Sequence, residues 1–261
     1  MFGFFRRRRR PGIRAQPFPE AWQQVLDERV PLFEQLEPTE QEELRGHIQV
    51  LLAEKNIEGC AGFEVTDEVR VTVAAHAALL LINRETDYYP RLDSILIYPS
   101  GYQAHGEEVL PDGSVVEGSQ HRLGESWTSG VVILSWDDVL SGAANVRDGH
   151  NVAVHEFAHQ LDQEDGAGDG VPTLEGRSAY RAWGRALAPE FQKLQERVAA
   201  GRRTKIDAYG ATNGAEFFAV VTEAFFEQPF KLEKHHPEVY AELVSFYKQD
   251  PAQRRRDRRD D

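Results

Sequence analysis

The chain of 261 residues contains a single cysteine, Cys60, and no long apolar run. One cysteine excludes an internal disulfide and fits a reducing compartment. The longest apolar stretch, residues 77–82, is far shorter than the roughly 20 residues that a membrane-spanning helix needs. We therefore expect no transmembrane segment and a fold that depends on its hydrophobic core.

Positive charge is scarce in the body of the chain and concentrated at the two ends. The sequence has 30 basic and 43 acidic residues, a net charge of −13. Residues 1–15 hold six arginines and no acid, and residues 254–261 hold five arginines and three aspartates, so residues 16–253 carry a net charge of −21. Binding to nucleic-acid phosphates needs a positive surface. The acidic body therefore excludes nucleic acid as the main partner.

The composition predicts one folded domain with charged ends. Apolar residues make up 41% and aromatic residues 10% of the chain, which is enough for a core. We expect residues 1–19 to form a basic, flexible arm, residues 20–251 a single domain, and residues 252–261 a charged, frayed tail. Docking of the arm on an acidic membrane surface or partner, through Phe4 and Phe5, is the alternative.

The periodicity of apolar residues predicts an α+β fold that is mostly helical and contains a small mixed sheet. A capping box of Thr39 and Glu42 predicts a helix that runs to about Lys55. A second helix is expected over residues 67–83, and further helices near residues 146–163, 177–200, 214–227 and 237–249. Residues 94–98 and 131–136 are typical of strands, and residues 111–113 of a hairpin turn.

The most informative segment is His155-Glu156-Phe157-Ala158-His159, an H-E-x-x-H motif. Residues four apart share one face of a helix, so His155 and His159 can direct two imidazoles at one metal ion. Glu156 projects beside them and can act as general base on a metal-bound water. This pattern indicates a zincin-type helix at a zinc site, and the alternative is a helix whose histidines only form hydrogen bonds.

A catalytic zinc needs a third protein ligand and an open position. Asp162 and Asp165 follow the motif where one peptidase class has Gly-x-x-His, so a glutamate from a later helix is expected instead. The candidates are Glu175, Glu190, Glu196, Glu216 and Glu223. A carboxylate among Phe217 and Phe218 is costly to bury without a partner, which favours Glu216. Glu223 could orient a ligand or form an ordinary ion pair.

Tyr209 lies seven residues before Glu216, in the loop that leads to the same helix. Its hydroxyl could donate a hydrogen bond to the oxyanion of a tetrahedral intermediate. A packing role for this side chain is the alternative.

Residues 155–162 and 209–219 resemble the Mlc titration factor A family of bacterial zinc peptidases. Residues 124–127, 132–136 and 246–251 resemble it too, so the similarity runs from about residue 31 to residue 251 and leaves both arginine clusters outside. The catalytic core is also similar to the protease domain of anthrax lethal factor, a gluzincin. The resemblance implies one zinc ion per chain, held by His155, His159 and Glu216, with Glu156 and Tyr209 as catalytic residues.

The resemblance further implies a histidine that reaches the zinc from the segment ahead of the sheet. His121 occupies the comparable place, and His105 and His150 are alternatives. The family's properties imply a cytoplasmic, aminopeptidase-like enzyme that acts on small peptides and binds a transcriptional repressor of the Mlc type, which controls sugar uptake. The alternative function is a regulatory binding protein that keeps the zinc fold and acts by sequestering the repressor.

Overall fold

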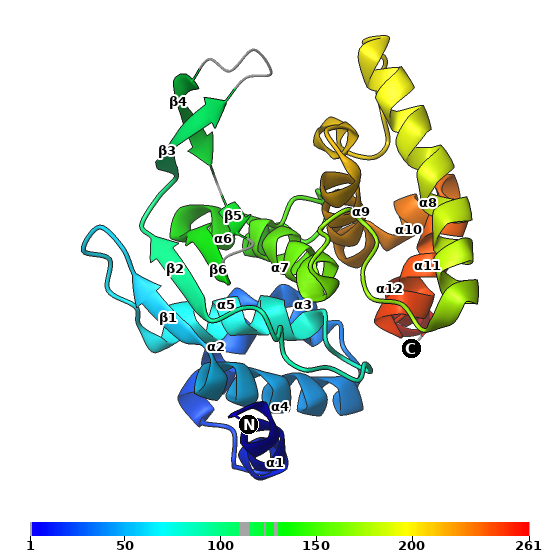
Figure 1. Ribbon diagram of the computed structural model, residues 1–261. Helices are drawn as coiled ribbons and strands as arrows, with labels where there is room; N and C mark the ends of the chain where they lie inside the picture. Colours follow the sequence, from blue (N-terminus) through cyan, green and yellow to red (C-terminus); the bar gives the residue numbers. More distant parts are fainter. Residues whose placement is uncertain (1, 110–114, 123, 128–129, 261) are drawn as a thin grey trace.

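The computed structural model describes the backbone of residues 2–109, 115–122, 124–127 and 130–260, and the side chains of residues 7–101 and 130–258. It has the predicted α+β architecture, mostly helical with a small sheet at one side of the molecule (Figure 1). No helix among these residues is long and apolar enough to cross a membrane.

The chain begins with helices, continues through the strands and ends with helices. The first group contains α1 (Phe2–Arg14), α2 (Glu20–Arg29), α3 (Pro31–Glu34), α4 (Pro38–Glu54) and α5 (Asp67–Leu79). The strands are β1 (Asn56–Gly59), β2 (Ser94–Tyr98), β3 (Tyr102–Val109), β4 (Val115–Arg122), β5 (Gly124–Trp127) and β6 (Val131–Ser135). The last group contains α6 (Trp136–Ala144), α7 (Val152–Asp162), the short 3-10 helix η1 (Gln163–Asp165), α8 (Gly176–Ala199), the 3-10 helix η2 (Ala208–Ala211), α9 (Gly214–Glu227), α10 (Pro229–His235), α11 (Pro237–Tyr247) and α12 (Pro251–Asp260).

The main sheet has the strand order β1-β2-β6-β5 and is mixed, as expected. β1, β2 and β6 run parallel, and β5 pairs antiparallel with β6. Side chains alternate between the two faces of a strand, and Ile95, Ile97, Val132 and Leu134 occupy the buried face. α5, whose side chains are almost all buried, packs against α2, α4 and α7 and forms the centre of the core (Figure 1).

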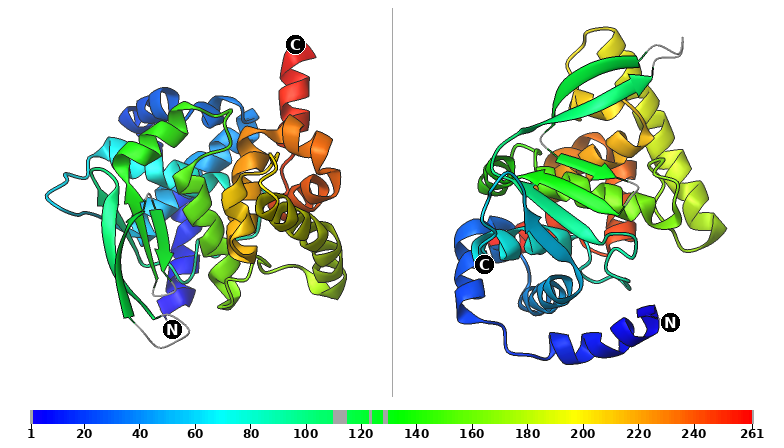
Figure 2. Two further views of the ribbon diagram at one scale, coloured as in Figure 1. Left: turned by 90° about the horizontal axis from the view of Figure 1, so that it is seen from above. Right: turned by 60° about the vertical axis from the view of Figure 1, so that its left-hand side comes forward.

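β3 and β4 form a separate antiparallel hairpin that extends away from the main sheet (Figure 2). The hairpin turn expected at residues 111–113 lies outside the described residues. The paired strands on either side of it agree with a hairpin at this position.

Three predicted helix boundaries are wrong. α7 begins at Val152 rather than near residue 146. α4 begins at Pro38, and Glu40 rather than Glu42 closes its first turn by accepting a hydrogen bond from the backbone of Glu37 at 3.0 Å. Proline is well suited to the first helical position, so the helix starts before Thr39. α5 ends at Leu79, and the turns that follow it contain Asn83 in the left-handed region, at a φ of 62°.

The ends of the chain are more ordered than expected. Arg10 on α1 donates hydrogen bonds to Glu54 at 2.9 Å and to Asp87 at 2.6 Å. On α12, Arg254 donates to Glu40 at 2.6 Å, and the side chain of Arg254 is almost fully buried. A flexible arm and a frayed tail are therefore wrong for residues 7–14 and 252–258, because acidic groups distant in sequence pair with these arginines. The side chains of Phe4 and Phe5 lie outside the described part.

Candidate metal centre

The motif helix α7 begins at a capped residue and buries one apolar face. The side-chain oxygen of Asn151 accepts a hydrogen bond from the backbone of Val154 at 3.1 Å, which satisfies a free donor of the first turn. Five apolar side chains of α7 are fully buried: Ala153, Val154, Phe157, Ala158 and Leu161. Packing of this face fixes the rotation of the helix, and His155 and His159 come to lie on the side next to α9.

α9 is built in a similar way and packs directly against α7. The side chain of Asn213 caps it by accepting a hydrogen bond from the backbone of Glu216 at 2.9 Å. Phe217, Phe218 and Val221 are buried in the core. Glu216 therefore lies in the first turn of a firmly held helix, and its carboxylate points to the histidines of α7.

The side chains of His155, His159 and Glu216 converge on one point. The two Nε2 atoms lie 3.1 Å apart, and Glu216 Oε2 lies 3.0 Å from His155 Nε2 and 3.4 Å from His159 Nε2. One possible ligand atom from each residue falls within 4.8 Å of the others. Two imidazole nitrogens and one carboxylate oxygen form the donor set of a catalytic zinc site, so the residues present fit a metal ion.

The electrostatics of this cluster also suit a cation. Burial raises the pKa of Glu216, but its hydrogen bonds to His155 and His159 outweigh burial and hold the pKa at about 2. Burial lowers the pKa of His155, and the hydrogen bonds to Glu216 and Glu223 reverse this effect and raise the pKa to about 10. Without a metal, a proton on His155 balances the carboxylates, and a metal ion can take its place.

His155 is held in place from its other side by Glu223, two turns along α9. His155 Nδ1 donates to Glu223 Oε1 at 2.8 Å, and the backbone of Asn151 donates to Glu223 Oε2. Because the carboxylate accepts, the proton of the neutral imidazole resides on Nδ1 and Nε2 is left for a metal. The structure thus favours the orienting role for Glu223 over an ordinary surface ion pair.

Asn151 and Glu227 complete this connection between the two helices, and the sequence reasoning missed both. Glu227 accepts hydrogen bonds from Asn151 Nδ2 at 3.1 Å and from the backbone of Gly149 at 3.0 Å. Burial raises the pKa of Glu227 to about 8. An asparagine immediately before an apolar helix is a capping signal that could have identified Asn151. No sequence pattern shows which carboxylate it would meet.

Glu156 and Tyr209 lie close to the three converging residues. Glu156 is buried, with 5% of its surface exposed, and its charge contributes to the raised pKa of His155. Tyr209 lies in η2, where Asp207 caps its backbone N–H at 2.7 Å. Its ring centroid is 6.1 Å from that of His155, and 57% of its surface is exposed. A largely exposed tyrosine beside the candidate metal ligands does not have the burial expected of a packing residue.

The remaining candidates lie elsewhere. His150 directs Nε2 to Asp207 at 3.4 Å, beside the segment that carries Tyr209. Glu190 pairs with His236 and Lys193, and Glu196 accepts a hydrogen bond from Gln192. Glu175 precedes α8 and is exposed.

The proposed fourth ligand cannot be placed beside the cluster. His121 lies in β4, opposite Gln103 of β3, and His105 lies in β3 opposite Ser119. The side chains of both histidines lie outside the described residues. Their part in metal binding stays a prediction.

The loop after α7 packs against the start of α9. Asp162 is fully buried, and both of its oxygens accept from the backbone of Gly170, at 2.8 and 3.0 Å. Gly170 has a φ of 86°, and a Cβ there would lie 2.2 Å from the carbonyl oxygen of Gly214. Only glycine fits this contact, which holds the loop against the first turn of the helix that carries Glu216.

Comparison with known proteins identifies a family that matches most of the chain. A family model described as "Glucose-regulated metallo-peptidase M90" matches residues 4–248. The match includes the arginines of residues 6–10, so the expected start of the similarity near residue 31 is wrong.

Several relatives cover most of the chain. An uncharacterised protein of Synechocystis is 44% identical over 90% of this chain and 86% of its own. A protein named Mlc titration factor A from Serratia proteamaculans is 31% identical over 89% of this chain and 88% of its own. A protein of the same name from Yersinia enterocolitica is 30% identical over 89% of this chain and 86% of its own.

Proposed function

Because the chain belongs to the family of glucose-regulated metallo-peptidases M90, we propose that it is a zinc-dependent peptidase with one zinc ion per chain. His155, His159 and Glu216 would hold the ion. The observation that carries the proposal is the convergence of two imidazole nitrogens and one carboxylate oxygen within 4.8 Å. Three protein ligands leave a tetrahedral ion one open position, as hydrolysis requires.

A zinc ion held by His155, His159 and Glu216 would supply a bound water with a pKa of ~7 and would polarise the scissile carbonyl. Glu156 follows His155 directly on α7, and its carboxylate takes the proton of the attacking water and passes it to the leaving amine. Tyr209 donates its hydroxyl proton in a hydrogen bond to the developing oxyanion. Glu223 keeps His155 in the tautomer that leaves Nε2 available.

The finer parts of the proposal rest on the family resemblance of the sequence. We propose an aminopeptidase-like activity on small peptides and a cytoplasmic location. Two relatives are named Mlc titration factor A, and this name supports a second role for the chain in binding a repressor of the Mlc type. The alternative function is a binding protein that retains the metal site and acts only by sequestering such a repressor.

Glu156→Gln tests the peptidase mechanism, because glutamine preserves the shape of the side chain but cannot accept the proton. We expect hydrolysis of an aminoacyl p-nitroanilide to fall to the background rate while the zinc content stays at one ion per chain. A chelator should also abolish hydrolysis by the wild-type protein, and added zinc should restore it. Glu175→Gln, which changes an exposed glutamate before α8, is the matched control and should keep full activity.

The outcomes separate the two functions. Wild-type turnover by Glu156→Gln would show that Glu156 is not the general base. If the wild-type protein binds zinc and a purified repressor of the Mlc type but hydrolyses none of a set of aminoacyl p-nitroanilides and short peptides, the binding function replaces the enzymatic one.

A further inference from the structure

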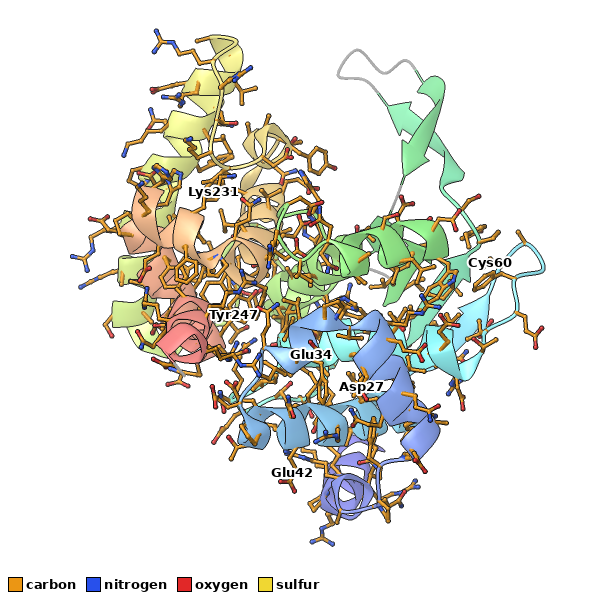
Figure 3. The ribbon with its side chains drawn as sticks, turned by 180° about the vertical axis from the view of Figure 1, so that it is seen from behind. Asp27, Glu34, Glu42, Cys60, Lys231 and Tyr247 are labelled. Atoms are coloured by element: carbon orange, nitrogen blue, oxygen red, sulfur yellow. The ribbon has the colours of Figure 1, made fainter. Side chains whose placement is uncertain are left out.

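A cavity of about 590 Å³ lies where α9 ends, α10 begins and α12 crosses them. Its wall includes four basic side chains, Arg147, Lys231, Arg255 and Arg258. Lys231 is labelled on α10 in the view from behind (Figure 3). Glu216 and Glu227 lie eleven residues apart on α9, so the cavity is ~16 Å along the helix from the candidate metal ligands.

Basic residues outnumber acidic residues in the described wall of this cavity, four to one. Glu227 is the one acidic residue of its described wall, and this buried carboxylate is engaged with Asn151 and Gly149. Two other acids, Asp148 and Glu233, lie outside the described wall. Asp148 accepts hydrogen bonds from Asn145 and from the backbone of His150, and Glu233 accepts from Arg256.

Arg255 is the least exposed of the four basic residues of the cavity and is held by several hydrogen bonds. Its guanidinium donates to Gln35 at 2.7 Å and to the backbone oxygens of Phe226 and Glu227 at 2.9 and 3.0 Å. These bonds use three of its five N–H groups and position the other two. Burial lowers the pKa of Arg255; the charge of Glu227 opposes this effect, and the nearby charge of Arg147 adds to it. Like charges are thus held together at a cost that an anion would offset.

The cavity also has an apolar side, formed by Val146, Pro229 and Phe230. Phosphate offers three acceptor oxygens and up to two negative charges, which suits several arginines better than a single carboxylate does. We propose that this cavity binds a small phosphate-bearing organic molecule, with the phosphate among the four basic side chains and the organic part against Phe230.

An occupant would contact the end of α9 and the segment that leads into α7. Gln228, which follows α9, donates to the backbone oxygen of Arg147 at 2.8 Å, and Glu227 accepts from the backbone of Gly149. Residues 146–151 lead directly into α7. Binding should therefore slow hydrogen exchange in residues 146–151 and at the end of α9, a readout that depends on no metal and no peptidase activity.

Calorimetric titration of the full chain with phenyl phosphate tests the proposal. Ionic strength is held constant with sodium chloride, because general screening would otherwise imitate or mask binding. We expect saturable binding with one site per chain. Inorganic phosphate should bind more weakly because it lacks the ring, and benzoate should bind more weakly because it carries one charge.

Arg147→Ala and Arg258→Ala remove exposed guanidinium groups for which the described residues show no hydrogen bond or ion pair, so both variants should fold. Each should weaken phenyl phosphate binding about tenfold, the value of one charge-assisted hydrogen bond. Arg202→Ala removes one charge from the loop after α8 and should bind like the wild type. Equal binding by all three variants, absence of saturation, or tighter binding of benzoate than of phenyl phosphate would overturn the proposal.

Discussion

Replacement of Glu223 by glutamine should weaken metal binding without removing a ligand. Glu223 lies behind His155, where its carboxylate accepts from His155 Nδ1 at 2.8 Å and from the backbone of Asn151. Glutamine has one accepting oxygen in place of two. In either orientation of the amide, one of these buried donors faces an NH₂ group. The imidazole then loses the charged partner that holds its orientation.

The size of the effect follows from the kind of bond that is lost. A hydrogen bond to a charged group contributes about 1.5–3 kcal/mol when buried. Glu223 is buried, with 6% of its surface exposed, so solvent does little to replace it. This free energy corresponds to a ten- to hundredfold lower affinity, the range typical of groups that orient metal ligands.

The zinc dissociation constant can be measured by competition with a chromophoric chelator at pH 7.5. Glu190→Gln is a matched control, because Glu190 accepts a comparable bond from His236 Nδ1 at 2.7 Å, away from the candidate metal ligands. The control should bind zinc like the wild type. A folded Glu223→Gln variant with an affinity within about twofold of the wild type would refute the orienting role, since that role requires at least a tenfold loss.

Three further predictions use other parts of the structure. Tyr209→Phe should lower kcat for an aminoacyl p-nitroanilide about 10²–10³-fold with unchanged zinc content, and an unchanged kcat would exclude the oxyanion role. The pKa of His155 is raised from 6.5 to about 10, so the proton on His155 stabilises the metal-free protein. This stabilisation is complete below pH 6.5 and is lost as the pH rises to 10. The free energy of unfolding in urea should decline over this range for the metal-free protein and not for the zinc-loaded protein. Gly170→Ala should lower the free energy of unfolding by about 2–4 kcal/mol because of its φ of 86° and the contact with Gly214, whereas Gly184→Ala, on α8 with no atom near its Cβ position, should be neutral or stabilising.

The sequence was most informative where a single helix or strand showed a clear apolar periodicity or carried a reactive side chain within it. The apolar periodicity of residues 214–227 predicted α9 to the residue, and residues 94–98 gave β2. Position 216, in the first turn of a mostly apolar helix, indicated a carboxylate with a special partner. These signals are local, so they need no knowledge of the tertiary fold.

Features that depend on contacts between distant segments could not be predicted. Arg10 meets Glu54 and Asp87, and Arg254 meets Glu40, so each pair joins residues between 44 and 214 positions apart. A run of arginines has the same composition whether it is solvated or paired. The predicted flexible ends were therefore wrong where these partners bind them.

The site itself follows from two stripes of polar residues that face each other on antiparallel helices. Residues 151, 155 and 159 recur every four positions on α7, and residues 216, 223 and 227 share one face of α9. Glu227 meets Asn151, Glu223 meets both Asn151 and His155, and Glu216 lies beside both His155 and His159.

This pairing fixes the register of the two helices and explains why their carboxylates differ. Glu216 adjoins two imidazoles, and its pKa is held at about 2. At the opposite end, Glu227 accepts hydrogen bonds from the neutral donors Asn151 and Gly149, and burial raises its pKa to about 8. A slip of one helical turn would separate Glu216 from His159 and leave buried polar groups of α9 without their acceptors and donors on α7. The cost of such unpaired groups, about 1–3 kcal/mol each, therefore keeps the three candidate ligands convergent before any metal binds.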